Sequence, residues 1–95
     1  MILDDIDIKI LRENFDDELI SRIDSNNVLR ILKYLDSNDI YYAKDLLLTS
    51  LDLFLLPCEE FIKRFEHLKT KLGSSFAEKL GNDASLIEIM YEKKI

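Results

Sequence analysis

The sequence predicts an all-α protein of six or seven short helices, and two observations lead to this prediction. Apolar residues recur at intervals of three and four along most of the chain, which is the pattern of helices that bury one face. Strand-like alternation is confined to residues 6–10, and no Asn-Gly or Asp-Gly pair could close a hairpin. With 47% hydrophobic and 34% charged residues, the composition is that of one compact domain, residues 1–95, rather than of a disordered chain.

The first two helices are expected near the N-terminus. Residues 6–10 alternate, but the apolar residues from Leu3 to Leu11 also fit one helical face, and we favour the helix. The acidic residues 16–18 suit the positive end of a helix dipole, so a short helix is expected after them, as far as Ile23.

The middle of the chain predicts two more helices. Asn26 or Asn27 is expected to cap a helix whose apolar face lies in residues 28–35. The polar residues 36–39 then break the pattern, and a helix over residues 40–48 follows. After it, Leu51, Leu53, Phe54, Leu55 and Leu56 form a dense apolar connector.

The clearest helix is predicted over residues 57–72. Pro57 suits its first turn, where a missing N–H has no consequence, and Gly73 suits its C-terminal cap. Its core-facing residues recur at intervals of four, three and four: Phe61, Phe65, Leu68 and Leu72.

Two short helices are expected to complete the fold. Ser74 or Ser75 would cap a helix that ends at Gly81. Asp83 would start the last helix, whose negative end the basic residues 93–94 complement. Four residues of this helix are expected to point inward: Leu86, Ile87, Met90 and Tyr91.

Parts of the chain resemble one another. Residues 28–35 resemble residues 61–68 at an offset of 33, and residues 37–46 loosely resemble residues 74–80 at an offset of 37. A period near 35 residues is typical of a small α-solenoid built from helical pairs. Because the two offsets differ, an irregular helical bundle is an equal alternative.

Residues 36–73 also follow a recognisable order: a polar break, an apolar run, an apolar stretch before Pro57, and a helix that ends in Leu-Gly. The segments are Asp36-Ser37-Asn38-Asp39-Ile40, Leu46-Leu47-Leu48, Leu53-Phe54-Leu55-Leu56, Glu59-Glu60-Phe61, Arg64-Phe65-Glu66-His67-Leu68 and Lys71-Leu72-Gly73. This order resembles one unit of the mitochondrial transcription termination factor (mTERF) family of helical repeats, although Pro57 lies later than in that family's pattern. The resemblance implies a curved solenoid that binds nucleic acid on a basic concave face. The basic residues that would serve are Lys63, Arg64, Lys69, Lys71 and Lys79.

Charge is unevenly distributed along the chain. Residues 1–60 hold 6 basic and 14 acidic side chains, residues 61–95 hold 7 basic and 5 acidic ones, and the net charge is −6. A protein of this charge is repelled by phosphate backbones, which disfavours nucleic acid as a partner. Lys63, Arg64, His67 and Lys71 share one quadrant of the predicted 57–72 helix with Glu60, and we interpret this quadrant first as a solvated face.

The sequence offers little chemistry for catalysis. Cys58 and His67 are the only thiol and the only imidazole, and on one ideal helix they would lie about 13 Å apart along the axis. Cys58 is therefore expected to pack in the core and His67 to lie at the surface or its edge. The acidic residues 4–7 lack the glycine and the glutamate of a calcium loop, and the chain has no phosphate-binding glycine loop or nucleophile elbow. We expect no enzyme, no bound metal and no cofactor.

The expected location is the cytoplasm. A lone cysteine suits a reducing compartment, and the acidic residues 1–7 do not have the charge of a leader peptide. The longest apolar stretch, residues 43–56, is interrupted by polar residues and is shorter than the ~20 residues of a membrane-spanning helix.

These observations favour a non-catalytic interaction module that binds another macromolecule, most simply a protein, as acidic inhibitors and immunity proteins do. Tyr41 and Tyr42 are adjacent, so at most one can point into a helical core, and exposed tyrosines are favoured in interfaces. With Phe54 and Leu55 they form the predicted contact patch. A homo-oligomer that buries residues 51–56 and a helical repeat that binds nucleic acid are the alternatives.

Overall fold

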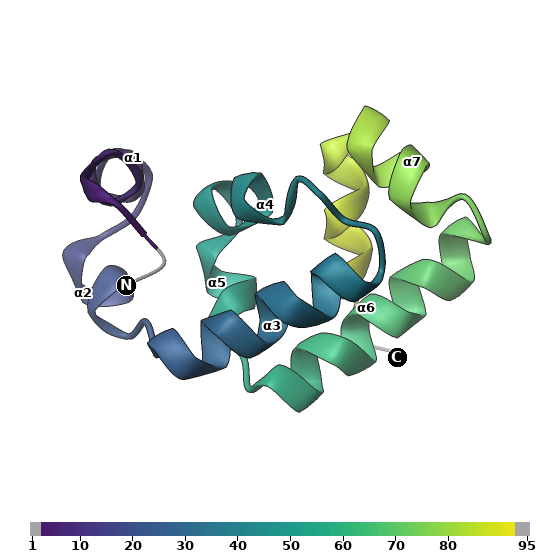
Figure 1. Ribbon diagram of the computed structural model, residues 1–95, viewed down its shortest axis with the longest axis horizontal. Helices are drawn as coiled ribbons and strands as arrows, with labels where there is room; N and C mark the ends of the chain where they lie inside the picture. The colour runs from purple at the N-terminus through teal and green to yellow at the C-terminus, as the bar shows by residue number, and fades with distance from the viewer. Residues whose placement is uncertain (1–2, 93–95) are drawn as a thin grey trace.

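A computed structural model describes residues 3–92, which form eight helical segments and no strand (Figure 1). The prediction of an all-α fold is confirmed. The segments are α1 (Asp5–Asn14), α2 (Asp17–Ser21), α3 (Ser25–Ser37), α4 (Ala43–Thr49), α5 (Leu51–Phe54), α6 (Cys58–Leu72), α7 (Phe76–Asn82) and the 3-10 helix η1 (Ala84–Tyr91). The helix beyond the six or seven expected is α5, which forms within the predicted connector.

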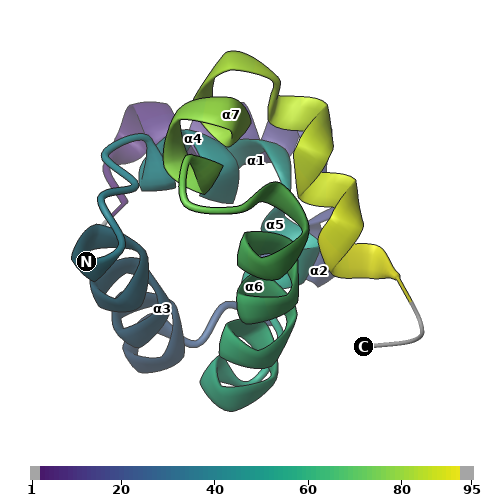
Figure 2. The same cartoon turned by 90° about the vertical axis from the view of Figure 1, so that its right-hand side faces the viewer.

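The two longest helices, α3 and α6, lie side by side (Figures 1 and 2). Beside them, α4, α5, α7 and η1 complete the core, and α1 and α2 lie at one end of the long axis. The largest fully buried side chains are Phe54, Phe61, Phe65, Leu11, Ile31, Leu35, Ile40, Leu47, Leu51, Leu53, Leu68 and Leu80. The core-facing pattern predicted for α6 is confirmed at three of its four positions, and the fourth, Leu72, is half-buried.

The cap of α3 differs from the prediction. Asp24, not an asparagine, accepts hydrogen bonds from the backbone N–H groups of Asn26 and Asn27 at 3.0 and 3.2 Å. The Asn27 side chain instead turns to the start of α6, where its amide donates to the carbonyl of Leu56 at 2.7 Å and accepts from the N–H of Cys58 at 2.9 Å. Pro57 immediately precedes α6 rather than lying in its first turn.

The loop between α3 and α4 delays the start of the second helix. Asp39 adopts a left-handed conformation with φ of 65°, and the helix expected from Ile40 begins at Ala43. Ile40 is nevertheless buried, with 1% of its surface exposed, because the turn directs it back onto the core. The same loop presents Tyr41 and Tyr42.

The C-terminal segments follow the predicted order with two differences. Asp83 accepts a hydrogen bond from the N–H of Ser85 at 3.1 Å and starts η1, as predicted, while α7 continues one residue past Gly81. Ile87 and Met90 are buried as expected, and Leu86 is half-buried. Tyr91 was expected inside but is 42% exposed, because its hydroxyl reaches outward to Asp52 at 2.8 Å. The basic residues 93–94 lie outside the described residues.

A capping box starts α1 and also fixes that helix to α4. Asp4 accepts from the N–H of Asp7 at 2.9 Å, and Asp7 accepts from the N–H of Asp4 at 3.2 Å. The same carboxylate oxygen, Asp7 Oδ2, also lies 2.6 Å from the ammonium of Lys44 on α4. The ion pair therefore joins two helices through residues that are 37 positions apart in the sequence.

Candidate functional site

The predicted contact patch is divided by the fold. Phe54 is 1% exposed and belongs to the core, so its assignment to an exposed patch was wrong. The reason is that the connector coils into α5, which turns Leu51, Leu53 and Phe54 inward together. Leu55 follows the helix and is half-buried.

The two tyrosines behave as their adjacency predicts, one outside and one partly inside. Tyr41 is 90% exposed, and its ring meets that of Tyr42 edge-on, with centroids 5.1 Å apart. Tyr42 is half-buried and donates a hydrogen bond from its hydroxyl to the carbonyl of Ala77 at 2.6 Å. Burial raises the pKa of the Tyr42 hydroxyl, and the neighbouring Tyr41 raises it further. Tyr42 is thereby fixed to α7, and Tyr41 rests against it.

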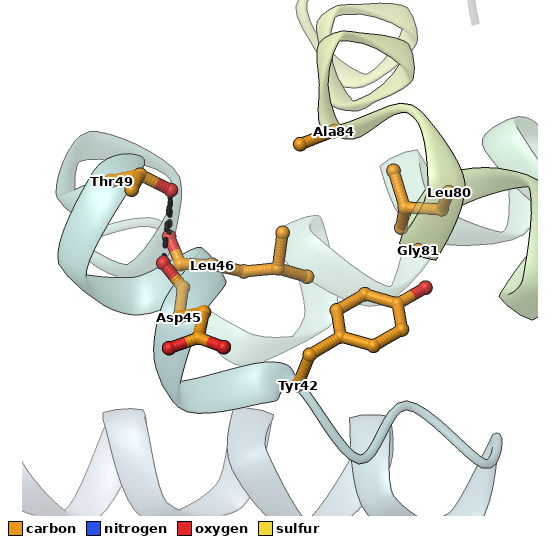
Figure 3. A pocket seen from close by; sticks show the side chains of 7 residues that line it. All are labelled: Tyr42, Asp45, Leu46, Thr49, Leu80, Gly81 and Ala84. Carbon is orange, nitrogen blue, oxygen red and sulfur yellow. Dashed lines mark hydrogen bonds between the residues drawn. The ribbon is translucent and has the colours of Figure 1, made fainter.

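Beside Tyr42 lies an open pocket of about 230 Å³ between α4, α7 and the start of η1 (Figure 3). Its lining residues are Tyr42, Asp45, Leu46, Thr49, Leu80, Gly81 and Ala84. Gly81 allows the close approach of the Tyr42 ring, because a Cβ atom at this position would lie 3.0 Å from Cε1 of that ring. Figure 3 shows Leu46, Leu80 and Ala84 directed toward the space above the Tyr42 ring.

The exposed carboxylates of α4, α5 and η1 are Asp45, Asp52 and Glu88, and we refer to them as the acidic group. Asp45 lines the pocket itself. Burial raises the pKa of the Tyr91 hydroxyl, and the hydrogen bond to Asp52 and the charges of Asp52 and Glu88 raise it further. Asp52 and Glu88 therefore lie near each other, around Tyr91.

Helices α4, α5, α7 and η1 contain two basic residues, Lys44 and Lys79. Both are bound to groups outside the pocket. Lys44 forms its ion pair with Asp7 on α1, and the Lys79 ammonium donates to the carbonyl of Leu72 at the end of α6, at 2.7 Å. Neither side chain lines the pocket, so its charged lining is a carboxylate alone.

Sequence reasoning found the tyrosines but not the pocket. Its walls come from residues 42–49 and 80–84, which are local neighbours only after the chain has folded. Gly81 was interpreted as a helix end, and the contact of its backbone with Tyr42 has no signature in the local sequence. The buried Leu46 and Leu80 look like any other core residues in the apolar pattern.

The basic residues proposed for nucleic acid face different directions. Arg64 donates to the carbonyl of Met90 in η1 at 2.8 Å and pairs with Glu60 at 3.2 Å. Lys69 lies on the other side of α6, where its ammonium is 2.8 Å from Asn38 Oδ1 and lies over the ring of Phe76. The structure does not bring these two cations to one surface.

Of the remaining residues of that set, Lys71 contacts the same segment as Arg64, residues 90–92. Lys71 lies 3.9 Å from Glu92, whose pKa is lowered chiefly by a hydrogen bond from His67 and also by the charge of Lys71. Lys79 is held at the end of α6, as described above. Lys63 is exposed, and it makes no ion pair within residues 3–92.

The lone thiol and the lone imidazole lie in different surroundings. Cys58 is 3% exposed in the core, as predicted, and His67 is half-buried at the edge, beside Glu92. Residues 3–92 contain no cluster of three or more His, Cys, Asp or Glu side chains placed to hold a metal ion. In the same range, none of the helices combines the length and the apolar character that crossing a membrane requires.

Searches with this chain against protein families, curated proteins and solved structures found no match. The resemblance to the mTERF repeat stays a prediction from the sequence, and the function has to be argued from the site.

Proposed function

We propose that this protein is a non-catalytic cytoplasmic module that binds another protein through Tyr41 and the pocket beside Tyr42. One observation carries the proposal: a tyrosine ring that is 90% exposed contacts the ring of Tyr42, which itself lines an apolar pocket. Aromatic side chains of this kind are enriched at the centres of protein interfaces, because they bury a large area with few rotatable bonds.

The packing of Tyr41 supports an interface rather than an incidental exposed ring. Its edge-on contact with Tyr42 fixes one side of the ring, and Tyr42 is itself bonded to α7. A partner that covers Tyr41 therefore meets a ring that is already oriented, which reduces the entropy lost on binding.

The size of the pocket favours a side chain over a metabolite. Pockets that enclose drug-sized ligands measure roughly 300–1,000 Å³, whereas this one measures about 230 Å³ and is open to solvent. Its lining holds one carboxylate, Asp45, and the hydroxyls of Tyr42 and Thr49, but both hydroxyls donate to backbone carbonyls rather than to that carboxylate. Protein binding accounts for these features without a reaction.

A photo-crosslinking experiment tests the proposal. The residue p-benzoylphenylalanine replaces Tyr41 in the cells that make the protein, and Asp17 on α2, at the far end of the molecule (Figure 1), receives the same residue as the control. We expect irradiation to yield a discrete protein adduct from position 41 and none of the same mass from position 17. Adducts that are equal at both positions, or absent at position 41, would contradict the proposal.

A stability measurement separates binding from folding. Because Tyr41 is almost fully exposed, Tyr41→Ala is expected to change the free energy of unfolding by at most about 0.5 kcal/mol. Added in excess as an untagged competitor, this variant should fail to suppress the adduct, whereas the unaltered protein should suppress it.

A further inference from the structure

We infer that the pocket beside Tyr42 receives an aliphatic side chain from a partner segment that carries Lys or Arg on either side of that residue. The inference rests on the proposed function and specifies the chemistry of the partner. Two independent observations lead to it, the apolar character of most of the pocket lining and the negative charge of Asp45, its one charged lining residue.

The lining selects an aliphatic group. Leu46, Leu80, Ala84 and the face of the Tyr42 ring present carbon to the space, and the pocket is open on one side. The pocket is open to solvent and large enough for water. An aliphatic side chain that enters it removes carbon surface from water and gains contacts with carbon.

The charges select cationic neighbours. Asp45 is the one charged residue that lines the pocket, and the basic residues of α4 and α7, Lys44 and Lys79, are bound to other groups. A segment with Lys or Arg beside its aliphatic residue meets this arrangement with opposite charge, and an acidic segment meets it with like charge. Complementarity of this kind distinguishes partners more than it strengthens any single contact.

Three acetylated and amidated tripeptides test the inference by NMR titration of the ¹⁵N-labelled full chain. Lys-Leu-Lys carries both required features, Glu-Leu-Glu reverses the charge, and Lys-Gly-Lys lacks the aliphatic side chain. We expect Lys-Leu-Lys to shift the amide signals of Tyr42, Leu46, Gly81 and Ala84 in a saturable way, and to bind about fivefold or more tightly than either other peptide. Raising the ionic strength to 0.5 M should remove most of its advantage over Glu-Leu-Glu.

Variants of the protein locate the binding. Ala84→Leu fills the pocket from its rim and should abolish saturable binding of Lys-Leu-Lys, and Thr49→Leu fills it from the opposite wall if the first variant is poorly folded. Asp45→Asn should weaken Lys-Leu-Lys by about two- to fivefold. Asp17→Asn on α2 removes the same charge far from the pocket and should leave the affinity unchanged.

The outcomes separate this inference from the proposed function. Equal binding of Lys-Leu-Lys and Glu-Leu-Glu, absence of saturable binding, or shifts away from the pocket would each overturn the inference. If a protein adduct still forms at position 41, the proposed function stands and its partner has a different chemistry. If Lys-Leu-Lys binds as expected but no adduct forms, the pocket is established as a site for cationic aliphatic segments and the contact through Tyr41 fails.

Discussion

Asn27 joins two parts of the chain that local sequence does not connect. Its amide oxygen accepts from the N–H of Cys58, one of the free donors at the start of α6, and its amide nitrogen donates to the carbonyl of Leu56. Pro57 cannot supply a side-chain cap, and the side chain from α3 takes over that role. The turn before α6 is thus held by a residue 31 positions away in the sequence.

Replacing Asn27 with alanine is expected to destabilise the protein by about 1–3 kcal/mol, because both groups of the partly buried turn lose their partner. Asn26→Ala is the matched control, since Asn26 is exposed and its side chain makes no hydrogen bond with residues 3–92. Urea unfolding followed by circular dichroism measures both variants. Equal effects of the two substitutions would contradict the role assigned to Asn27.

The pair of Asp7 and Lys44 is a second contact at the scale of single residues, and it makes stability depend on pH. The hydrogen bond from Lys44, at 2.6 Å, lowers the pKa of the Asp7 carboxyl below its ordinary value of 3.8, against the opposing effect of burial. Because the folded-state pKa is lowered, the stabilisation is fully present above pH 3.8 and is lost as the pH falls through the folded-state value.

We therefore expect Lys44→Met to reduce the free energy of unfolding at neutral pH and to raise the pKa of Asp7 toward 3.8. The difference from the unaltered protein should shrink as Asp7 becomes protonated in acid. Denaturant unfolding across the pH range, with a carboxyl-resolved NMR titration, provides the measurement, and Lys33→Met on the exposed face of α3 is the control. A loss that is the same at every pH would assign the effect to packing of the lysine stem.

At the scale of helices, the aromatic rings bring α3, α6 and α7 together. The ring of Phe65 on α6 meets Tyr34 on α3 edge-on at 5.7 Å between centroids, and meets Phe76 on α7 in the same way at 6.1 Å. Phe61, one turn earlier on α6, stacks against Phe65 at 6.1 Å. Tyr34 also donates from its hydroxyl to Glu66, so the same side chain contributes an apolar contact and a polar one.

Phe65→Ala is expected to lower the free energy of unfolding by about 3–5 kcal/mol, because it leaves a cavity where three helices meet. A loss of this size is a large part of the roughly 5–15 kcal/mol that stabilises a typical domain. Phe65→Leu should cost clearly less, since it retains most of the volume, and Lys63→Ala on the exposed side of α6 should stay within about 0.5 kcal/mol. Thermal and urea unfolding compare the three, and a small loss for Phe65→Ala would contradict the central place of this ring.

Helix α6 was predictable from the sequence because every signal for it is local. Its apolar spacing, the acids in its first turn and the glycine at its end, which adopts a φ of 82°, lie within one short stretch. The burial of Phe54 was missed because Asp52 is the only polar residue in residues 51–56. One polar position does not show that the segment is helical or which side of it faces the core. The pocket was missed because its two walls are distant in the sequence, and the outward turn of Tyr91 depends on a carboxylate 39 positions away.

At the scale of the whole molecule, internal contacts take up several of the basic side chains and leave many carboxylates in solvent. Arg64 and Lys79 hold the ends of η1 and α6 through backbone carbonyls, and Lys69 lies between α3 and α7. With a net charge of −6, the surface repels polyanions at long range. This distribution agrees with a partner that carries basic residues.

The competing hypothesis is a helical repeat that binds nucleic acid, which requires basic rather than acidic residues on the contact surface. We expect fluorescence anisotropy to show no salt-dependent binding to short single-stranded or duplex oligonucleotides, even at low ionic strength, because the net charge is −6 and Lys69 does not share a surface with Arg64. The control variant is Lys63→Glu with Lys71→Glu, which reverses two exposed charges of α6 and leaves Arg64 in its contact with Met90. If the unaltered protein bound at low salt and this variant did not, the face of α6 with Lys63 and Lys71 would be the working surface, and the prediction of a protein partner would fail. If both failed to bind, the repulsion expected from the acidic surface would account for the result, and the search would continue with basic protein partners.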